Sequence, residues 1–518
     1  MSGRAVVIGS GVGGLAAALL LARDGWSVTV LEQHTRAGGF LHRFFREGVG
    51  YDTGFHYVGA AAPDQLVGRM LHHLGVADQL RFTPLDPEGF DLLRFPGLEV
   101  AVPAGLDRWL DRLGGIFPAE RAGLARYKER HLAAIAAYGW YNLDLSTPPE
   151  AILPWEEQTL QQVLDDCFID PRIKVVLGGQ SALYGVPAPE APFGLHAIVT
   201  DHFLTGAWTV EGGGDHLAMV LVRRLRGLGG RVLLRHRAEA IDVEAGRVTA
   251  VHAAGGRFPA DLVVADIHPR LTLDLLPAGS TRPAYRTRVT SARPGRAHLG
   301  LYLRVRGDVG DLARRNLYRY ASWDPEAIAR PATAAHVPFW YLTAPGRRDP
   351  RQRPGVDEVV LGLLQVDAAT FSGPASSGAA SGVTPGPPVH GDHGYADDPA
   401  YQAQKAALLD ASLAAIRTDY PGWEILRAEV STPRTTERYG GTFGGATYGH
   451  AHTVDQMGRH RLPMQGRVGG LVHVGQTVGF PGICGAMMTA YVACAPLLGA
   501  ERLVDELRGG VQPDKTTG

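Results

Sequence analysis

The feature that most constrains the fold is a glycine-rich turn near the start of the chain. Gly9, Gly11 and Gly14 form the pattern G-x-G-x-x-G between an apolar strand-like stretch, Arg4–Ile8, and an apolar helix-like stretch, Leu15–Asp24. The first glycine permits a tight turn, the second lets the backbone approach a pyrophosphate, and the third lets helix and strand pack closely. The pattern therefore predicts the start of a parallel, Rossmann-like sheet that binds a dinucleotide.

An acidic residue completes this unit at the end of a second predicted strand. Residues 27–31 (SVTVL) form a strand-like stretch with apolar Val28, Val30 and Leu31, and Glu32 follows it. A carboxylate at this end of the strand can accept a hydrogen bond from a ribose hydroxyl, while the helix N-terminus attracts the phosphates. The dinucleotide-binding residues that we expect here are Gly9, Gly11, Val12, Gly13, Gly14, Glu32 and Gln33.

Two further segments favour FAD over NAD. Gly38 and Gly39 follow Glu32 closely, and a second glycine pair at this place allows close passage along FAD. Residues 471–485 (LVHVGQTVGFPGICG) predict a second strand, turn and helix. The N-terminus of that helix could stabilise the negative N1–C2 carbonyl edge of a reduced flavin. These segments add to the expected cofactor site Gly38, Gly39, His42, Gly475, Gln476, Gly482 and Ile483.

The rest of the chain alternates between helical and strand-like regions. Helical stretches such as 65–74 and 121–138 dominate residues 60–200, and strand-like runs between 298 and 367 predict a second sheet. Residues 372–393 are rich in Gly, Ser, Ala and Pro, which predicts a mobile loop, and 509–518 reads as a disordered tail.

Composition narrows the class of protein. The chain has 518 residues, a formal net charge of −1 and 45% hydrophobic residues, which is ordinary for a soluble globular protein and argues against nucleic-acid binding. Cys167, Cys484 and Cys494 form no metal-ligand spacing and no disulfide framework, so we expect no metal and a reducing, cytoplasmic setting. The sequence has no apolar run long enough for a transmembrane span, but it leaves peripheral membrane contact open.

Three segments resemble the phytoene desaturase, carotenoid isomerase and retinol saturase group of FAD oxidoreductases. Residues 6–39 are similar to its N-terminal FAD motif, 210–251 to its middle segment and 470–494 to its C-terminal motif. The resemblance implies that the strand bearing Ala238 lies along the adenine part of FAD.

Two pieces favour the retinol saturase branch of this group. One is GGFLHRF followed by YDTGFHYVG, which contains His56, and the other is TPRTTERYGGTFGGATYG at 432–449. Residues 372–393 and Glu211 depart from the motifs, and the motifs do not name the substrate.

The resemblance also implies a division into domains. The expected fold class is α/β, with a Rossmann-like FAD-binding domain of the two-dinucleotide-binding type interleaved with an α+β substrate domain. The FAD-binding domain comprises 1–70, 200–290 and 430–508, and the substrate domain comprises 71–199 and 291–429.

This kind of cofactor predicts redox chemistry on a hydrophobic molecule. Flavin N5 exchanges a hydride with carbon. We expect an oxidoreductase that acts on C=C or C–C bonds of a polyene or isoprenoid-like substrate, and the resemblance to the retinol saturase branch implies saturation ahead of desaturation. A proton donor is then needed opposite the hydride, and the candidates are His56, Tyr57, Tyr448 and His42. Each could instead be structural, with the tyrosines as aromatic walls and His56 as a donor to backbone or cofactor.

Several alternatives stay open at this point. Proteins with these motifs include enzymes for redox-neutral carotenoid cis–trans isomerisation and for amine oxidation. A non-enzymatic lipid escort has the same fold, but an escort predicts eroded FAD motifs. The aromatic stretch 131–141 could be ordinary core or a tunnel wall, and Cys484 could pack or take part in redox chemistry. The external electron partner and the oligomeric state are not determined by the sequence.

Overall fold

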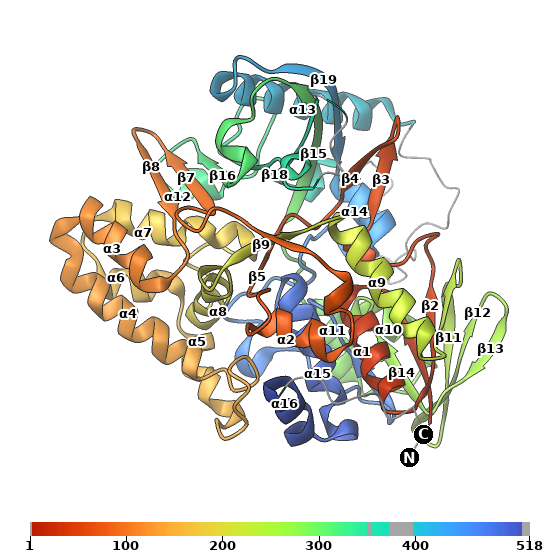
Figure 1. Cartoon of the computed structure of the whole chain (residues 1–518). Coiled ribbons are helices and arrows are strands. Elements are labelled where there is room, and N and C mark those ends of the chain that lie inside the picture. The colour runs from red at the N-terminus through yellow and green to blue at the C-terminus, as the bar shows by residue number, and fades with distance from the viewer. Residues whose placement is uncertain (1–2, 350–354, 356, 372–396, 510–518) are drawn as a thin grey trace.

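The computed structural model describes residues 3–349, 355, 357–371 and 397–509 (Figure 1). The predicted mobile loop at 372–393 lies outside the described residues. So does the predicted tail at 509–518, except for Gly509, which ends the last helix. Within the described ranges, every helix is too short or too polar to cross a bilayer.

One layer of the fold is a five-stranded parallel sheet whose strands come from both ends and the middle of the chain. The strand order is β10-β2-β1-β14-β20, and each neighbouring pair is parallel. The strands are β1 (Arg4–Ile8), β2 (Ser27–Glu32), β10 (Arg231–Leu234), β14 (Leu262–Ala265) and β20 (Leu471–His473). Their carboxyl ends share one edge, so the loops that follow them meet there. The predicted Rossmann-like sheet is confirmed.

Three helices pack together beside this sheet. Helix α1 (Val12–Arg23) is buried from Val12 to Ala22 and contacts α9 (Gly213–Gly227) and α15 (Gly482–Leu498). Helix α1 begins three residues before the predicted Leu15, so its first N–H groups lie within the glycine-rich turn. A Cβ atom at Gly13 would lie 3.0 Å from the carbonyl oxygen of Ala486, so α1 and α15 approach closely at this glycine.

A small antiparallel sheet and two helices follow the middle strands. Its strands are β11 (Ala238–Glu244), β12 (Arg247–Ala253) and β13 (Gly256–Pro259), and the helices are α10 (Pro269–Leu275) and α11 (Pro283–Ser291). Strand β10 ends at Leu234, because Arg235 adopts a φ of +59° and leaves the extended conformation.

The second large layer is a seven-stranded mixed sheet, which confirms the predicted second sheet. Its order is β19-β15-β18-β17-β16-β7-β8, and all pairs are antiparallel except β16 with β7. The strands are β7 (Asp91–Phe95), β8 (Leu98–Val102), β15 (Ala297–Arg306), β16 (Asn316–Tyr320), β17 (Phe339–Thr343), β18 (Glu358–Val366) and β19 (Glu424–Ser431). Helix α13 (Pro399–Asp419) lies beside this sheet at the top of Figure 1.

A helical insertion occupies the left of Figure 1. Its helices are α3 (Leu106–Ile116), α4 (Arg121–Ala136), α5 (Leu153–Glu157), α6 (Leu160–Cys167), α7 (Pro171–Leu177) and α8 (Phe193–Leu204). The prediction that helices dominate residues 60–200 missed the hairpin of β7 and β8, which the Pro96–Gly97 turn joins, with Gly97 at a φ of +75°. Proline followed by glycine is a turn signal between short apolar runs.

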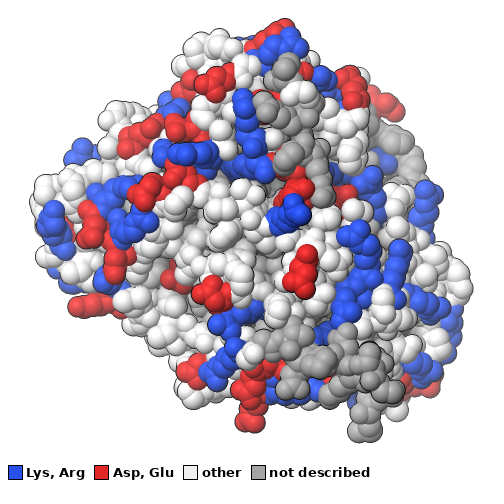
Figure 2. Space-filling view, viewed as in Figure 1, with Lys and Arg blue, Asp and Glu red and all other residues white. Residues whose placement is uncertain are grey.

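Shorter elements connect these layers. They are β3 (Arg43–Arg46), β4 (Val49–Asp52), β5 (Val58–Gly59), α2 (Leu66–His73), β6 (Phe82–Pro84), β9 (Ala207–Val210), α12 (Pro325–Ala329), α14 (Pro433–Gly440) and α16 (Ala500–Gly509). The surface in Figure 2 carries acidic and basic side chains interspersed over the helical insertion, with basic side chains gathered on the right, where α9 lies. Arg223 and Arg226 of α9 are exposed, while Leu217 and Leu221 face the core.

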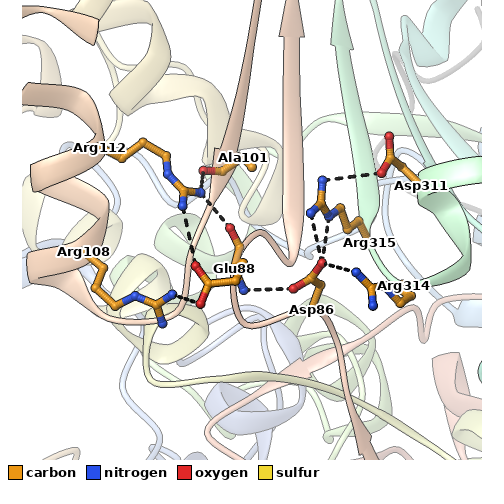
Figure 3. Close-up of polar contacts among 8 residues, drawn as sticks. All are labelled: Asp86, Glu88, Ala101, Arg108, Arg112, Asp311, Arg314 and Arg315. Atoms are coloured by element: carbon orange, nitrogen blue, oxygen red, sulfur yellow. Dashed lines mark hydrogen bonds and ion pairs between the residues drawn. The ribbon is translucent and has the colours of Figure 1, made fainter. Parts of the chain in front are cut away.

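Ion pairs link the segment before β7 to α3 and to the loop before β16 (Figure 3). The carboxylate of Asp86 accepts hydrogen bonds from Arg314 and Arg315, each at 2.9 Å, and Glu88 pairs with Arg108 of α3. The Glu88 and Arg108 side chains are 64% and 47% exposed, and a surface pair of this kind contributes about 0–1 kcal/mol. The Asp86 side chain is only 7% exposed, so water screens its ion pairs less.

Candidate functional site

The glycine-rich turns from both ends of the chain face one cavity of about 390 Å³ at the carboxyl edge of the parallel sheet. The predicted cofactor residues that line it are Gly9, Gly11, Val12, Gly13, Glu32, Gln33, Gly38, Gly39, Ala238, Gly475, Gln476, Gly482 and Ile483. The structure thus brings together segments more than 400 residues apart in sequence. Gly14 and His42 are not among the lining residues.

The first turn is built so closely that side chains would not fit. An added Cβ would lie 2.5 Å from the Asp266 carbonyl oxygen at Gly9, 2.5 Å from Asp266 Oδ2 at Gly11 and 2.7 Å from the same Oδ2 at Gly14. Gly9 also has a φ of +95°, which favours glycine. Gly14 therefore serves the packing of α1 against the end of β14, and the backbone at Gly11 and Gly13 forms the open wall of the cavity.

Glu32 joins the two N-terminal glycine turns through Ser10. Its Oε2 atom accepts hydrogen bonds from Ser10 N at 3.0 Å and Ser10 Oγ at 2.5 Å, and Oε1 accepts from His34 N at 2.7 Å. Gly38 N in turn donates to both the carbonyl oxygen and Oγ of Ser10, at 3.0 and 3.1 Å. A carboxylate has about four acceptor sites, so Glu32 keeps capacity for a ribose hydroxyl.

Asp266 is a site residue that the sequence analysis missed. It follows β14 directly and lines the cavity, and among the described residues its Oδ2 atom has no hydrogen-bond partner. Burial raises the pKa of Asp266 to about 7. A carboxylate at the carboxyl end of a predicted parallel strand was the available signal.

The C-terminal segment places a helix N-terminus at the other end of the cavity, as predicted. Gly482 begins α15 with a φ of +81°, and Gly482 and Ile483 line the cavity. The Thr489 hydroxyl accepts from Gly475 N at 2.7 Å and donates to the Ala486 carbonyl at 2.6 Å, which ties the turn after β20 to α15. The partial positive charge of the helix N-terminus therefore faces the cavity.

Three of the four proposed proton donors line the same cavity. Burial lowers the pKa of His56 to about 4, so its imidazole is neutral at pH 7, and its Nδ1 atom has no partner among the described residues. The Tyr448 hydroxyl donates to the Ala182 carbonyl at 3.0 Å, and burial raises the Tyr448 pKa, which suits an aromatic wall. The fourth candidate, His42, is turned to the Gly39 carbonyl and stacks on His34 at 5.1 Å.

A second cavity of about 420 Å³ lies against the first, and most of its walls are apolar. It is lined by the helical insertion and by the start of α15. Its lining residues include Tyr138, Trp140, Tyr141, Leu145, Ile152, Ile198, Val199, Phe203, Met464, Phe480, Cys484, Met488 and Val492. Tyr57, Gly482 and Ile483 line both cavities, so the two meet there.

The aromatic stretch 131–141 was predicted to be either ordinary core or a wall of a substrate tunnel. His131 and Ala134 are buried in the core of α4, whereas Tyr138–Tyr141 line the cavity, so each reading holds for part of the stretch. Burial raises the pKa of the Cys484 thiol to about 12, so the thiol stays protonated and serves as a packing group of the wall. The other residues that line the second cavity come from separate segments of the chain, and no sequence motif marked them as site residues.

Known proteins place this geometry in a family. A sequence model described as flavin containing amine oxidoreductase matches residues 12–277. The chain belongs to this family. The description of the family states that its members contain a flavin, and the resemblance drawn from the sequence motifs is confirmed.

Relatives support the branch within the family. The chain is 26% identical to an all-trans-retinol 13,14-reductase of Rattus norvegicus, over 95% of this chain and 85% of the relative, and the same identity and coverage hold for the Homo sapiens protein of that name. A 4,4'-diaponeurosporene oxygenase of Staphylococcus aureus is 26% identical over 52% of this chain and 56% of the relative.

Solved structures show the same fold. An oxidoreductase from Methanosarcina mazei is 14% identical, with a TM-score of 0.62 over 94% of this chain and 99% of that chain. Putrescine oxidase bound to putrescine is 16% identical, with a TM-score of 0.61 over 96% and 99%. At this identity the likeness concerns the fold alone.

Proposed function

We propose that this protein is an FAD-dependent oxidoreductase that acts on C=C or C–C bonds of a hydrophobic polyene or isoprenoid-like substrate, with saturation as the leading direction. One observation carries the proposal. A glycine-lined cavity suited to a dinucleotide opens at Tyr57, Gly482 and Ile483 onto an apolar cavity suited to a long carbon chain. The relatedness to all-trans-retinol 13,14-reductases over 95% of the chain supports the same reaction class.

The residues of the first cavity fit FAD. Glu32 would accept from the ribose hydroxyls, and the backbone at Gly11 and Gly13, with the N-terminus of α1, would hold the pyrophosphate. The N-terminus of α15 at Gly482 would face the flavin ring. When bound, FAD supplies a hydride acceptor or donor to the substrate carbon.

The second cavity recognises its substrate through apolar surface. Burial of apolar area contributes about 25 cal/mol per Å², so a long chain gains its affinity from contact with walls such as Trp140, Ile198 and Phe203 rather than from charges. The partner that we propose is therefore a hydrophobic small molecule. The protein would take such a molecule from a membrane surface, so we also propose peripheral contact with a membrane.

Saturation of a double bond consumes a proton, and His56 is placed to supply it. The ring lines the first cavity, stays neutral at pH 7 and has an Nδ1 atom without a partner among the described residues. A neutral imidazole has no extra proton to give, so His56 would act as a relay: one ring nitrogen accepts a proton from solvent as the other releases its hydrogen to the substrate.

The experiment that tests this function reads both the cofactor and the product mass. The purified protein is examined for flavin absorbance at about 370 and 450 nm, as for any bound flavin. It is then incubated without oxygen, with its flavin photoreduced, against a panel that contains all-trans-retinol and a carotenoid. A product heavier by two hydrogens supports saturation.

Other outcomes point elsewhere. An unchanged mass with an altered retention time would make the protein a cis–trans isomerase, and loss of two hydrogens by the oxidised protein would make it a desaturase. Absence of flavin absorbance, together with retained polyene binding, would contradict the oxidoreductase and support a lipid escort.

A further inference from the structure

The first cavity reaches beyond the turns that would hold the cofactor, onto one face of the seven-stranded sheet. The cofactor residues predicted from the sequence all lie outside this sheet. Yet Gly300 of β15, Leu363 of β18 and Ser431 of β19 line the same cavity. This part of the cavity is therefore room for which the cofactor residues do not account.

These three residues form one row across three neighbouring strands. Gly300 lies opposite Leu363 on one side and opposite Ser431 on the other, so the three positions share one face of the sheet. The row continues to Tyr341 of β17, which is paired with Leu363. The ring centroid of Tyr341 lies 6.4 Å from that of Tyr57, which lines both cavities. The row therefore starts beside the junction of the two cavities.

The row sets the direction and the length of a groove. Neighbouring strands lie about 4.8 Å apart, so the row from Leu363 to Ser431 extends about 10 Å. A Cβ atom added to Gly300, at its middle, would lie 2.5 Å from Ser431 Oγ and 2.8 Å from the Tyr302 hydroxyl. Glycine thus lets the Tyr302 side chain lie against the sheet instead of standing in the cavity. We call this row, with His298 and Tyr302 on either side of it, the sheet groove.

The polar groups of the sheet groove are paired with one another or with its rim. His298 and Tyr302 lie two residues before and after Gly300 on β15, so they share its face, and both line the cavity. His298 Nδ1 lies 2.8 Å from Thr447 Oγ1, and the Tyr302 hydroxyl lies 3.2 Å from Ser431 Oγ. Burial lowers the pKa of His298 to about 4, so its ring carries no charge at pH 7. A hydrocarbon can therefore occupy the groove without breaking these bonds or burying a charge.

We propose that the sheet groove binds one arm of the substrate and the second cavity binds the other, so that the reacting double bond at the junction lies inside the chain. The substrate class is then a linear polyene with a carbon arm on each side of the reacting bond, rather than a molecule that reacts at its end. The inference rests on the proposed function, because it names the substrate class of the same site. Since each further apolar contact adds to affinity, binding should strengthen with chain length beyond what the second cavity alone holds.

The test fills the sheet groove and leaves the cofactor turns untouched. Leu363→Trp places an indole on the floor of the groove, and the flavin absorbance should be kept. Leu426→Trp is the matched control, because Leu426 lies on the same sheet, is 37% exposed and lines neither cavity. Gly300→Ala is the second variant, for the case in which Leu363→Trp fails to fold. Its Cβ would displace the Tyr302 hydroxyl and so narrow the groove by a smaller change.

Binding is measured on the flavin-loaded, oxidised protein by the quenching of protein fluorescence with linear polyenes of increasing length. For the wild type and Leu426→Trp, we expect Kd to fall through the whole series. For Leu363→Trp, Kd of the shortest polyene should stay unchanged, and Kd of the longest should rise by about tenfold because part of its apolar contact is lost. With photoreduced flavin, the wild type should saturate a bond inside the chain, as located by fragmentation of the product in a mass spectrometer.

The outcomes separate this inference from the proposed function. If no polyene reacts but Leu363→Trp weakens the binding of the long polyenes alone, the function fails and the sheet groove stands. Folded Leu363→Trp and Gly300→Ala proteins that bind the whole series like the wild type would overturn the inference, and so would equal weakening of short and long polyenes. Loss of flavin absorbance in a folded variant would assign the groove to the cofactor and overturn the inference as well.

Discussion

The two cavities of this protein are built in different ways. The first cavity has the backbone of several glycine-rich turns in its wall and contains carboxylates, notably Glu32 and Asp266. The second is walled by apolar and aromatic side chains from the helical insertion and α15. A cofactor shared by a whole family calls for a fixed backbone cradle, whereas a particular substrate calls for side chains that can differ from one member to another. Variants that affect one cavity and spare the other test this division.

The largest effect is expected from Gly11→Val, which belongs to the first cavity alone. Its Cβ would lie 2.5 Å from Asp266 Oδ2 and would also fill the space beside the pyrophosphate, so flavin binding should be abolished. The measurement is the absorbance at about 450 nm of the purified protein. The control is Gly115→Val on α3, where an added Cβ meets no atom within 4 Å. A Gly11→Val protein with full yellow colour would sink the cofactor assignment.

A change at His56 should affect chemistry and leave the cofactor in place. His56→Ala removes the neutral imidazole that faces the first cavity, and loss of a positioned proton donor lowers turnover by about 10²- to 10⁴-fold. Single-turnover rates and flavin content are measured on the same sample, with His336→Ala, an exposed histidine, as the control. Undiminished turnover with bound flavin would reduce His56 to a structural residue.

The ionisation of Asp266 should be visible as a pH-dependent stability of the flavin-free protein. The folded-state pKa of about 7 lies above the ordinary value of 3.8, so the folded protein binds this proton more tightly than the unfolded chain does. Stability is therefore lost as pH rises from about 4 to 7, and the full deficit of about 4 kcal/mol is present above pH 7.

Asp266→Asn should remove this deficit. The variant is expected to be more stable than the wild type at pH 8 and equal to it at pH 4, as measured by urea unfolding. The control is Asp261→Asn, whose carboxylate pairs with Arg4 at the surface and has a lowered pKa, so its loss should be slightly destabilising at pH 8. Equal pH dependence in wild type and Asp266→Asn would contradict the assignment.

The smallest effect is expected from a change confined to the second cavity. Val199→Trp places an indole in space that the substrate would fill in the second cavity. The displaced part of a polyene loses about 1–2 kcal/mol of apolar contact with the protein, so KM should rise by roughly tenfold. The absorbance of the bound flavin should be unchanged. Leu132→Trp, at an exposed position on α4, is the control. A Val199→Trp protein that loses flavin but keeps its KM would reverse the roles given to the two cavities.

The difference between a wall made by glycine-rich turns and a wall made by apolar side chains explains what the sequence could predict. The turns at Gly9–Gly14, Gly38–Gly39 and 471–485 were recognisable because a backbone that must approach a ligand accepts only glycine, and that requirement leaves a pattern in one sequence. The parallel strands were recognisable because they are short, apolar and buried on both faces.

The remaining parts of the site left no such pattern. Asp266 is a single acid whose role depends on which strand ends lie beside it, and no single segment of the sequence reveals the strand order. Residues such as Ile198 and Met488 look like ordinary core until the fold shows that they surround a cavity. His42 looked like a site residue because it lies in a motif, yet a bond to the Gly39 carbonyl turns it aside.

The position of β20 beside β14 has a consequence for how the protein is made. The strands β1 and β2 leave the ribosome early, but residues 471–473 emerge on the order of a minute later at ordinary rates of synthesis. Until then the sheet ends at β14 with an unpaired edge, and the turn that begins α15 does not yet face the first turn. The nascent chain therefore cannot hold its flavin stably during most of its synthesis, and the late arrival of one three-residue strand sets the moment at which loading begins.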